Sequence, residues 1–307
     1  MNKKKYLALF SLVIILAFIG YIIYDTARPA RDNEEQTSLA DNEAKLPDQW
    51  RIQQEVFIRE GLNAVAVSAD GDIYLGGDSF ISCYNKELKE TWNLDTPEKI
   101  TAISVYGDTV FAASEELIFL LNKNGKLICE WGPYEVNCII TSVSANKDYL
   151  AIADAGNKTV FILRKDGEVL SMIGHFGEKL IIPSPYFDVN LTDDNNLFLA
   201  NTGYFRIEKR TVDGKILSSF GEPGSALENF CGCCNPAHFA LIPQGFVTAE
   251  KGINRIKIMG PEGGFIEYVS SENDFIASVP LDVASADGKT IYGANSADYK
   301  LYVFTRR

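Results

Sequence analysis

Half of the chain's cysteines and one of its two histidines lie within the eight residues 231–238. This cysteine segment contains Cys231, Cys233, Cys234 and His238. Thiolate and imidazole groups bind zinc and copper, and closely spaced thiols also form disulfides or redox pairs. The density of these side chains makes this segment the first place where chemistry is expected.

Three interpretations of the cysteine segment stay open. The first, which we favour, is structural disulfides, because disulfides persist outside the cytoplasm. The partners would be the other three cysteines, Cys83, Cys129 and Cys138. The second is a thiolate-bound metal held by the four side chains named above, although the spacing matches neither a zinc ribbon nor a haem-attachment motif. The third is a redox-active dithiol.

A small residue followed by a polar residue ends a short apolar run at six places, 36 to 49 residues apart. The polar members of these steps are Asp78, Ser114, Asp154, Asn201, Glu250 and Asn295. A repeat of about 40–50 residues built from short strands is typical of a propeller. The steps therefore predict six blades, with one polar side chain at an equivalent position in each.

Each repeat also carries the other strands of a blade. An alternating apolar strand precedes the step, and turns such as Asp166-Gly167 separate the two strands that follow it. Such turns are strong hairpin signals because glycine accepts a positive φ. Residues 50–307 are thus predicted to form an all-β, six-bladed β-propeller of four-stranded antiparallel blades. The blades are expected near 62–94, 99–131, 139–173, 186–220, 237–269 and 281–306.

The last repeat ends after its third strand, at Phe304. The segment 50–58 precedes the first blade and has no repeat of its own. We expect it to supply the missing fourth strand, because this closure removes an exposed sheet edge.

The N-terminus predicts a membrane anchor. Three lysines at 3–5 precede an uncharged apolar run at 6–24, which is long enough to cross a bilayer. Residues 1–5 are interpreted as a cytoplasmic tail, 6–24 as an N-terminal transmembrane helix that acts as an uncleaved signal-anchor, and 25–49 as a flexible tether. The lysines favour a cytoplasmic N-terminus and a single-pass membrane protein whose propeller is extracytoplasmic. A cleaved signal peptide is the less favoured alternative, because the apolar run is long and ends in bulky residues.

The formal net charge of −12 makes the chain a poor nucleic-acid binder. In the predicted ring, the loop that carries the cysteine segment lies on the same face as the six polar steps. Glu250 should therefore be a neighbour of this loop at one mouth of the central channel, and His238 should begin an inner strand. The oxygen atoms of the steps could bind calcium, or they could cap strand ends and bond turn amides.

The segments 153–160 and 249–256 resemble the NHL repeat, and 236–245 resembles the proline-led start of one. The resemblance covers about residues 50–307, although blades one and two lack the basic residue that follows the step. It implies a six-bladed propeller that mediates binding. Some relatives of such propellers are lactonases or phosphotriesterase-like hydrolases with a channel calcium, and one is a lyase with a histidine-bound zinc. Two histidines in total weigh against a three-histidine zinc site.

The leading hypothesis is an extracytoplasmic binding or scaffold module for a protein or small-molecule ligand at the channel mouth. The alternative is a calcium-dependent lactonase- or esterase-like hydrolase, or a lyase, with its site in the channel. The predicted ligand-binding residues are Asp78, Asp154, Asn201, Glu250, Arg255 and Asn295. The cofactor would be calcium or a metal bound by the cysteine segment, and the sequence identifies no catalytic residue.

Overall fold

The computed structural model describes residues 11–20, 49–232, 234–252, 254–271, 275–276 and 278–307. The chain divides into two units, Met1–Leu46 and Pro47–Arg307, which are described separately. In the first unit, residues 11–20 are helical. No helix among the described residues is long and apolar enough to span a membrane, so the predicted transmembrane helix is not confirmed. Its remaining residues lie outside the described part, as do the predicted tail and nearly all of the tether.

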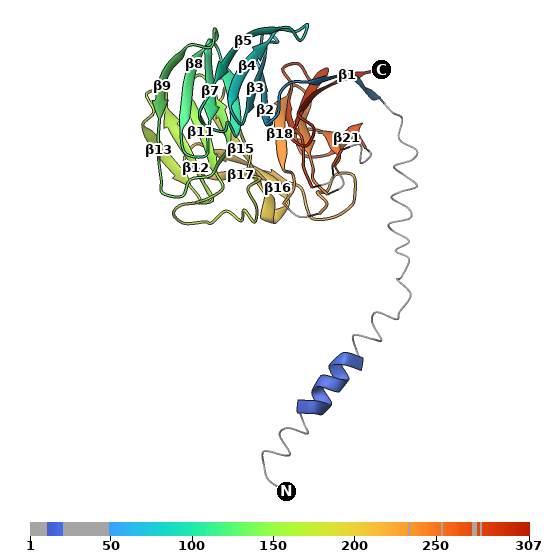
Figure 1. Cartoon of the computed structure of the whole chain (residues 1–307). Coiled ribbons are helices and arrows are strands. Elements are labelled where there is room, and N and C mark those ends of the chain that lie inside the picture. Colours follow the sequence, from blue (N-terminus) through green and yellow to red (C-terminus); the bar gives the residue numbers. More distant parts are fainter. Residues whose placement is uncertain (1–10, 21–48, 233, 253, 272–274, 277) are drawn as a thin grey trace. The chain divides into compact units, whose positions relative to one another are not determined.

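The second unit forms six four-stranded antiparallel sheets, which are the predicted blades (Figure 1). Blade one contains β2 (Leu62–Val67), β3 (Ile73–Gly77), β4 (Phe80–Tyr84) and β5 (Glu90–Asp95). Blade two contains β6 (Ala102–Tyr106), β7 (Thr109–Ala113), β8 (Ile118–Asn122) and β9 (Leu127–Trp131). Blade three contains β10 (Ile140–Ala145), β11 (Tyr149–Asp154), β12 (Thr159–Arg164) and β13 (Val169–Ile173).

The other three blades follow the same plan. Blade four contains β14 (Val189–Leu191), β15 (Asn196–Asn201), the short 3-10 helix η1 (Thr202–Tyr204), β16 (Arg206–Thr211) and β17 (Ile216–Phe220). Blade five contains β18 (His238–Ile242), β19 (Gly245–Ala249), β20 (Ile256–Met259) and β21 (Phe265–Ser270). Blade six contains β22 (Asp282–Ala284), β23 (Thr290–Asn295) and β24 (Lys300–Arg306). The blade boundaries agree with the predicted ones to within three residues.

The ring closes as the sequence predicts. β1 (Trp50–Phe57) pairs antiparallel with β24 and becomes the outer strand of blade six, where Trp50 lies opposite Arg306 and Phe57 opposite Lys300. The first and last strands of the propeller therefore share one sheet, and the free edge that β24 would otherwise present is covered.

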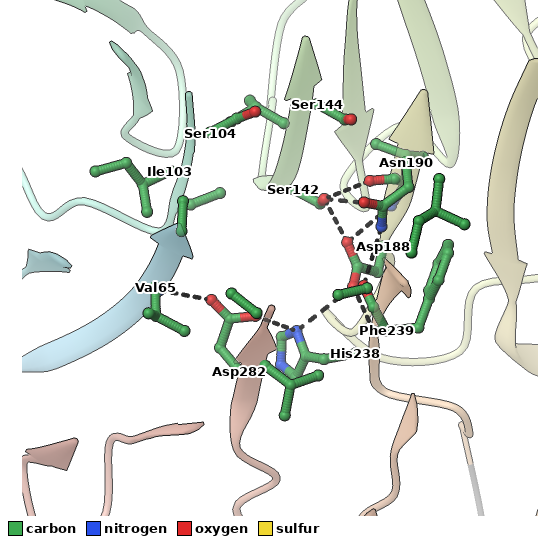
Figure 2. A pocket seen from close by; sticks show the side chains of 18 of the residues that line it. Val65, Ile103, Ser104, Ser142, Ser144, Asp188, Asn190, His238, Phe239 and Asp282 are labelled. Carbon is green, nitrogen blue, oxygen red and sulfur yellow. Dashed lines mark hydrogen bonds and ion pairs between the residues drawn. The ribbon is translucent and has the colours of Figure 1, made fainter. Parts of the chain in front are cut away.

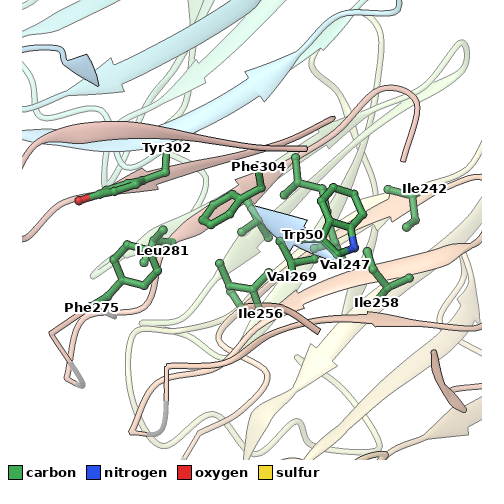
Figure 3. Close-up of a cluster of buried hydrophobic side chains, with 13 residues drawn as sticks. Trp50, Ile242, Val247, Ile256, Ile258, Val269, Phe275, Leu281, Tyr302 and Phe304 are labelled. Atoms are coloured by element: carbon green, nitrogen blue, oxygen red, sulfur yellow. The ribbon is translucent and has the colours of Figure 1, made fainter. Parts of the chain in front are cut away.

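The hydrophobic cores lie between neighbouring blades. Alternate residues of β12 face opposite sides: Phe161 packs with blade two, whereas Val160 packs with blade four. This is the two-residue period of a strand that is buried on both faces. Figure 3 shows the cluster between blades five and six, in which Trp50 of β1 packs with residues of both, including Val247 and Phe304.

Glycine turns pack blades two, three and five closely against the blade before them. In blade three, the Asp166-Gly167 turn closes with a 2.9 Å bond from the Arg164 amide to the Glu168 carbonyl, and Gly167 has a φ of 88°. A Cβ atom on Gly167 would lie only 2.9 Å from Trp131 of blade two. The same close approach joins Gly125 to Trp92 and Gly263 to Phe220. These turns therefore require glycine for its small size as well as for its positive φ.

Candidate functional site

The cysteine segment lies in the loop between β17 and β18 and contacts Glu250, as predicted. The Cys231 amide donates a 3.0 Å hydrogen bond to Glu250 Oε2. Asn235 Nδ2 donates to the Lys251 carbonyl at 2.9 Å, and the Lys251 amide donates to Asn235 Oδ1 at 3.0 Å. Two loops of blade five are thus joined, and His238 begins the inner strand β18. Cys233 lies outside the described residues.

A buried ion network holds this loop in place. Glu250 lies 3.0 Å from Arg255 Nη2 and 2.8 Å from Lys257 Nζ, and all three side chains are at most 1% exposed. Lys257 Nζ also donates to the Leu227 and Asn229 carbonyls at 3.2 and 2.8 Å. Burial lowers the pKa of Lys257, and the charge of Glu250 opposes this shift. Glu250, held by Arg255, therefore positions the cysteine segment through the Cys231 amide.

Most of the other polar steps bond the backbone of their own turns. Asp154 Oδ1 accepts bonds from the amides of Ile139 at 2.9 Å, Gly156 at 2.9 Å and Asn157 at 3.2 Å. Ser114 and Asn295 also accept bonds from amides of their own turns. Asn201 Oδ1 instead accepts a 3.1 Å bond from the Ile181 amide, in the segment that precedes blade four. Asp78 is the exposed exception and bonds Asn63 Nδ2 at 2.9 Å. These contacts favour the capping interpretation, and ligand binding by the steps stays a prediction.

The cysteines outside the cysteine segment lie in blades one and two and in the connection to blade three. Cys83 lies in β4 and Cys129 in β9, whereas Cys138 lies between blades two and three. Among the described residues, these three thiols and that of Cys231 form no disulfide. No group of three or more His, Cys, Asp or Glu side chains in the described part is placed to hold a metal ion. The predicted disulfides to Cys83, Cys129 and Cys138 are therefore not formed in the part of the chain that the structure describes. The metal and redox interpretations include Cys233, which lies outside that part, and stay predictions.

The structure places a different set of titratable groups in the channel. The six inner strands line a central cavity of about 230 Å³. Figure 2 shows His238 between two carboxylates in this cavity. His238 Nδ1 lies 3.6 Å from Asp282 Oδ1 and 4.0 Å from Asp188 Oδ2. Blades four, five and six thus each contribute one such side chain at the start of the inner strand.

Backbone amides of adjacent blades fix the two carboxylates. Asp188 Oδ2 accepts a 2.8 Å bond from the Phe239 amide, and its Oδ1 accepts from the Val189 amide at 2.8 Å and from Ser142 Oγ at 2.5 Å. Asp282 Oδ2 accepts from the Val65 amide at 2.8 Å. Each carboxylate therefore joins two inner strands and still directs one oxygen towards His238.

Burial tunes these groups towards neutral pH. It raises the pKa of Asp188 to about 6, where the proximity of His238 opposes the shift, and it raises the pKa of Asp282 to about 7. Burial also lowers the pKa of His238, against the attraction of Asp188. The group therefore offers a neutral imidazole beside carboxyl groups that can hold or release a proton near pH 7, which suits acid–base chemistry or a charge-dependent ligand.

An aromatic bridge connects this acid–base group to the cysteine segment. The Tyr186 ring meets the His238 ring edge-on, with centroids 6.0 Å apart. The Lys251 ammonium lies 4.5 Å from the centroid of the same tyrosine ring. Because Lys251 also bonds Asn235, the loop and the channel mouth form one continuous site.

Sequence reasoning found His238 but missed Asp188 and Asp282. The signal was present, because all three residues stand between two apolar residues at the start of an inner strand: Phe187-Asp188-Val189, Ala237-His238-Phe239 and Leu281-Asp282-Val283. A comparison of the first strands of successive repeats would have aligned them.

Comparisons with known proteins identify the fold. No protein family and no curated protein matches the sequence. Virginiamycin B lyase from Staphylococcus aureus is 16% identical with a TM-score of 0.59, and the match covers 84% of this chain and 99% of that one. A streptogramin B lyase is 14% identical with a TM-score of 0.60, covering 84% and 98%. A protein of unknown function from Bacteroides thetaiotaomicron is 12% identical with a TM-score of 0.64, covering 86% and 74%. At these identities the likeness concerns the propeller fold alone.

Proposed function

We propose that this protein is a membrane-anchored, extracytoplasmic binding module that holds its ligand at the channel mouth. The observation that carries the proposal is the position of His238 between Asp188 and Asp282 in the central cavity. Three blades each contribute one of these side chains, and burial raises the pKa values of Asp188 and Asp282 towards neutral pH. Perturbed titratable groups in a concave site are typical of functional sites.

The charge of the cavity limits the ligand. Among the cavity-lining residues, all of which the structure describes, there is no lysine or arginine. Asp188, Asp282 and His238 are the titratable side chains, and serine, threonine and asparagine side chains supply further polar groups. A small ligand with an ammonium group or several hydrogen-bond donors complements this lining best.

The binding test compares wild-type protein with an Asp188→Asn, Asp282→Asn double variant. Thermal unfolding is followed with cadaverine, spermidine, choline, Ca²⁺ and Zn²⁺. At pH 8 we expect at least one amine to raise the melting temperature of the wild type and to have no effect on the double variant. An Asp193→Asn variant is the matched control, because Asp193 is an exposed carboxylate of blade four.

Either of two results would contradict the binding proposal. The first is that no compound of the panel stabilises the wild type. The second is that a stabilising compound acts equally on the double variant, since its site would then lie elsewhere.

The anchor is supported by the uncharged apolar run at 6–24 after three lysines. Alkaline extraction of membranes should leave the full-length protein in the pellet, and external protease should degrade the propeller in spheroplasts. Release by alkali, or protection from the protease, would contradict this part of the proposal.

A lyase is the second candidate function, because a neutral imidazole beside a protonatable carboxyl group can act as a base–acid pair. One protein of similar fold is a virginiamycin B lyase and another is a streptogramin B lyase, and a histidine-to-alanine variant of the first is catalytically inactive in a structure with quinupristin. If this candidate is right, wild-type protein consumes virginiamycin B or quinupristin in a chromatographic assay and the His238→Gln variant does not. Loss of this turnover when a chelator is added would show that the lyase depends on a metal. The alternative of a calcium-dependent hydrolase is tested with lactone and ester substrates, with and without a chelator.

A further inference from the structure

A second cleft lies between blades four and five, at the turns that follow β18 and β20. Its volume is about 300 Å³, and its walls include Phe198, Phe220, Phe246 and Pro261. The Phe246 ring lies 5.2 Å from that of Phe198 and 4.9 Å from that of Phe220, so three aromatic rings form one wall. This cleft shares no lining residue except Leu241 with the central cavity.

The corresponding position between blades two and three is filled by the chain itself. There, Lys165 stands two residues before the turn glycine Gly167, and its ammonium lies 5.0 Å from the Phe111 ring and 5.2 Å from the Tyr106 ring. In blade five the residue two before the turn glycine is Pro261, which has no long side chain to extend over the rings. Phe198 occupies the place of Phe111, two residues before the alanine of its step. The aromatic wall is thus repeated, but no lysine extends over it from the turn of blade five.

The cleft also contains an ammonium group and a hydroxyl group that can donate hydrogen bonds to a ligand. The Lys209 ammonium lies 5.7 Å from the Phe198 ring, and Lys209 is paired in register with Ser218. Across the described residues, neither side chain makes an ion pair or hydrogen bond. By contrast, the equivalent serine of blade three, Ser171, donates to the Val212 carbonyl at 2.5 Å and so ties down the next turn. Glu262, at the rim, makes no ion pair with Lys209.

We propose that this cleft is a second binding site, for a small aromatic carboxylate. The ligand's ring would pack on the phenylalanine wall, and its carboxylate would accept bonds from Lys209 and Ser218. An apolar group with an anionic end matches two features of this cleft: the half-buried rings of Phe198 and Phe220, and a lysine ammonium that makes no ion pair among the described residues. The site is independent of the function proposed for the channel mouth.

Phenylacetate is the probe, and its binding to the full-length protein is measured by NMR line broadening and calorimetry. We expect phenylacetamide and benzylamine to bind at least tenfold more weakly, because they lack the carboxylate. Lys209→Met should weaken phenylacetate binding about 10- to 100-fold, the range expected for a lost charged hydrogen bond. Glu262→Gln should strengthen it, since a repelling carboxylate is removed.

A transplant from the filled interface gives the sharpest test. The double variant Lys209→Leu, Pro261→Lys reproduces Leu120 and Lys165 of the blade two–three interface, and it should abolish phenylacetate binding while thermal stability is kept. His238→Gln should leave phenylacetate binding unchanged. The proposal for this cleft and the proposal for the channel can therefore fail independently of each other. Absence of phenylacetate binding, equal binding of the amide, or unaltered binding by the transplant would each overturn the proposal.

Discussion

The two halves of the propeller use polar residues differently. In blades one to three, which the structure describes without a gap, the ion pairs are all exposed, as for Arg164 and Glu168. Blade four instead buries Glu208 between two arginines, and blade five buries Glu250 with Arg255 and Lys257. The channel wall differs in the same way: serine and threonine on one side, Asp188, His238 and Asp282 on the other.

The difference indicates what the buried charges do. Taking ions out of water is costly, and an apolar core of the same shape is often as stable. Blades one to three are closed by such cores, so the fold itself does not need a buried ion network. In blade five the network binds the backbone of the loop that leads to His238. We infer that blade five keeps its buried ion network, despite the desolvation cost, because the network fixes the loop beside His238.

The largest expected effect comes from breaking the network in blade five. Lys257→Met leaves the Leu227 and Asn229 carbonyls without their donor and unbalances Glu250, so the free energy of unfolding should fall by about 3–5 kcal/mol. Urea denaturation measures the change. Hydrogen exchange should also become faster in the loop before His238.

The matched control lies in the other half. Arg164 is 52% exposed and its partner Glu168 is 65% exposed, so Arg164→Met should cost less than about 1 kcal/mol. Equal losses in the free energy of unfolding for Lys257→Met and Arg164→Met would contradict the distinction between the two halves.

A smaller effect is expected from the raised pKa of Asp282. Because the folded protein keeps this proton until about pH 7 and the unfolded chain loses it near pH 4, the free energy of unfolding should fall as pH rises between those values. Asp282→Asn keeps an acceptor for the Val65 amide and cannot ionise. At pH 8 the variant should therefore be more stable than the wild type, with no gain at pH 4. A wild-type advantage at pH 8 would argue against a raised pKa.

The smallest effect is expected on the hydroxyl side of the channel. Ser144 Oγ accepts a 2.9 Å bond from the Leu191 amide. Ser144→Ala should cost about 1 kcal/mol, because a buried amide loses its acceptor, and should leave the pH dependence of stability unchanged. Denaturation at pH 5 and pH 8 checks both points, and a changed pH dependence would show that the hydroxyl side also tunes the carboxylates.

The fold could be predicted because its signals are local and repeated. The six small–polar steps and the glycine turns count the blades, and the strand without a repeat, Trp50–Phe57, closes the ring as expected. The contact between the cysteine segment and Glu250 also followed from loop order alone. The transmembrane helix rested on hydropathy, and residues 6–10 and 21–24 of that segment lie outside the described part of the chain.

The site was harder to predict because its members are far apart in sequence. Asp188 and Asp282 are single aspartates at strand starts, and only the ring geometry brings them to His238. Conversely, Glu250 and Arg255 have the residue types of a ligand site, but they form an ion pair with each other and bond the backbone. Residue type indicates possible chemistry, whereas burial and partners decide its use.

The most direct test of the acid–base group is the titration of His238 by NMR. The chain has two histidines, so the His238 signals are assigned by comparison with a His175→Gln variant. The account predicts that His238 titrates below its ordinary pKa of 6.5 and that its signals show a further inflection near pH 7 from Asp282. This inflection should disappear in Asp282→Asn. A His238 pKa at or above 6.5, with no such inflection, would contradict the assignment of His238, Asp188 and Asp282 as the functional site.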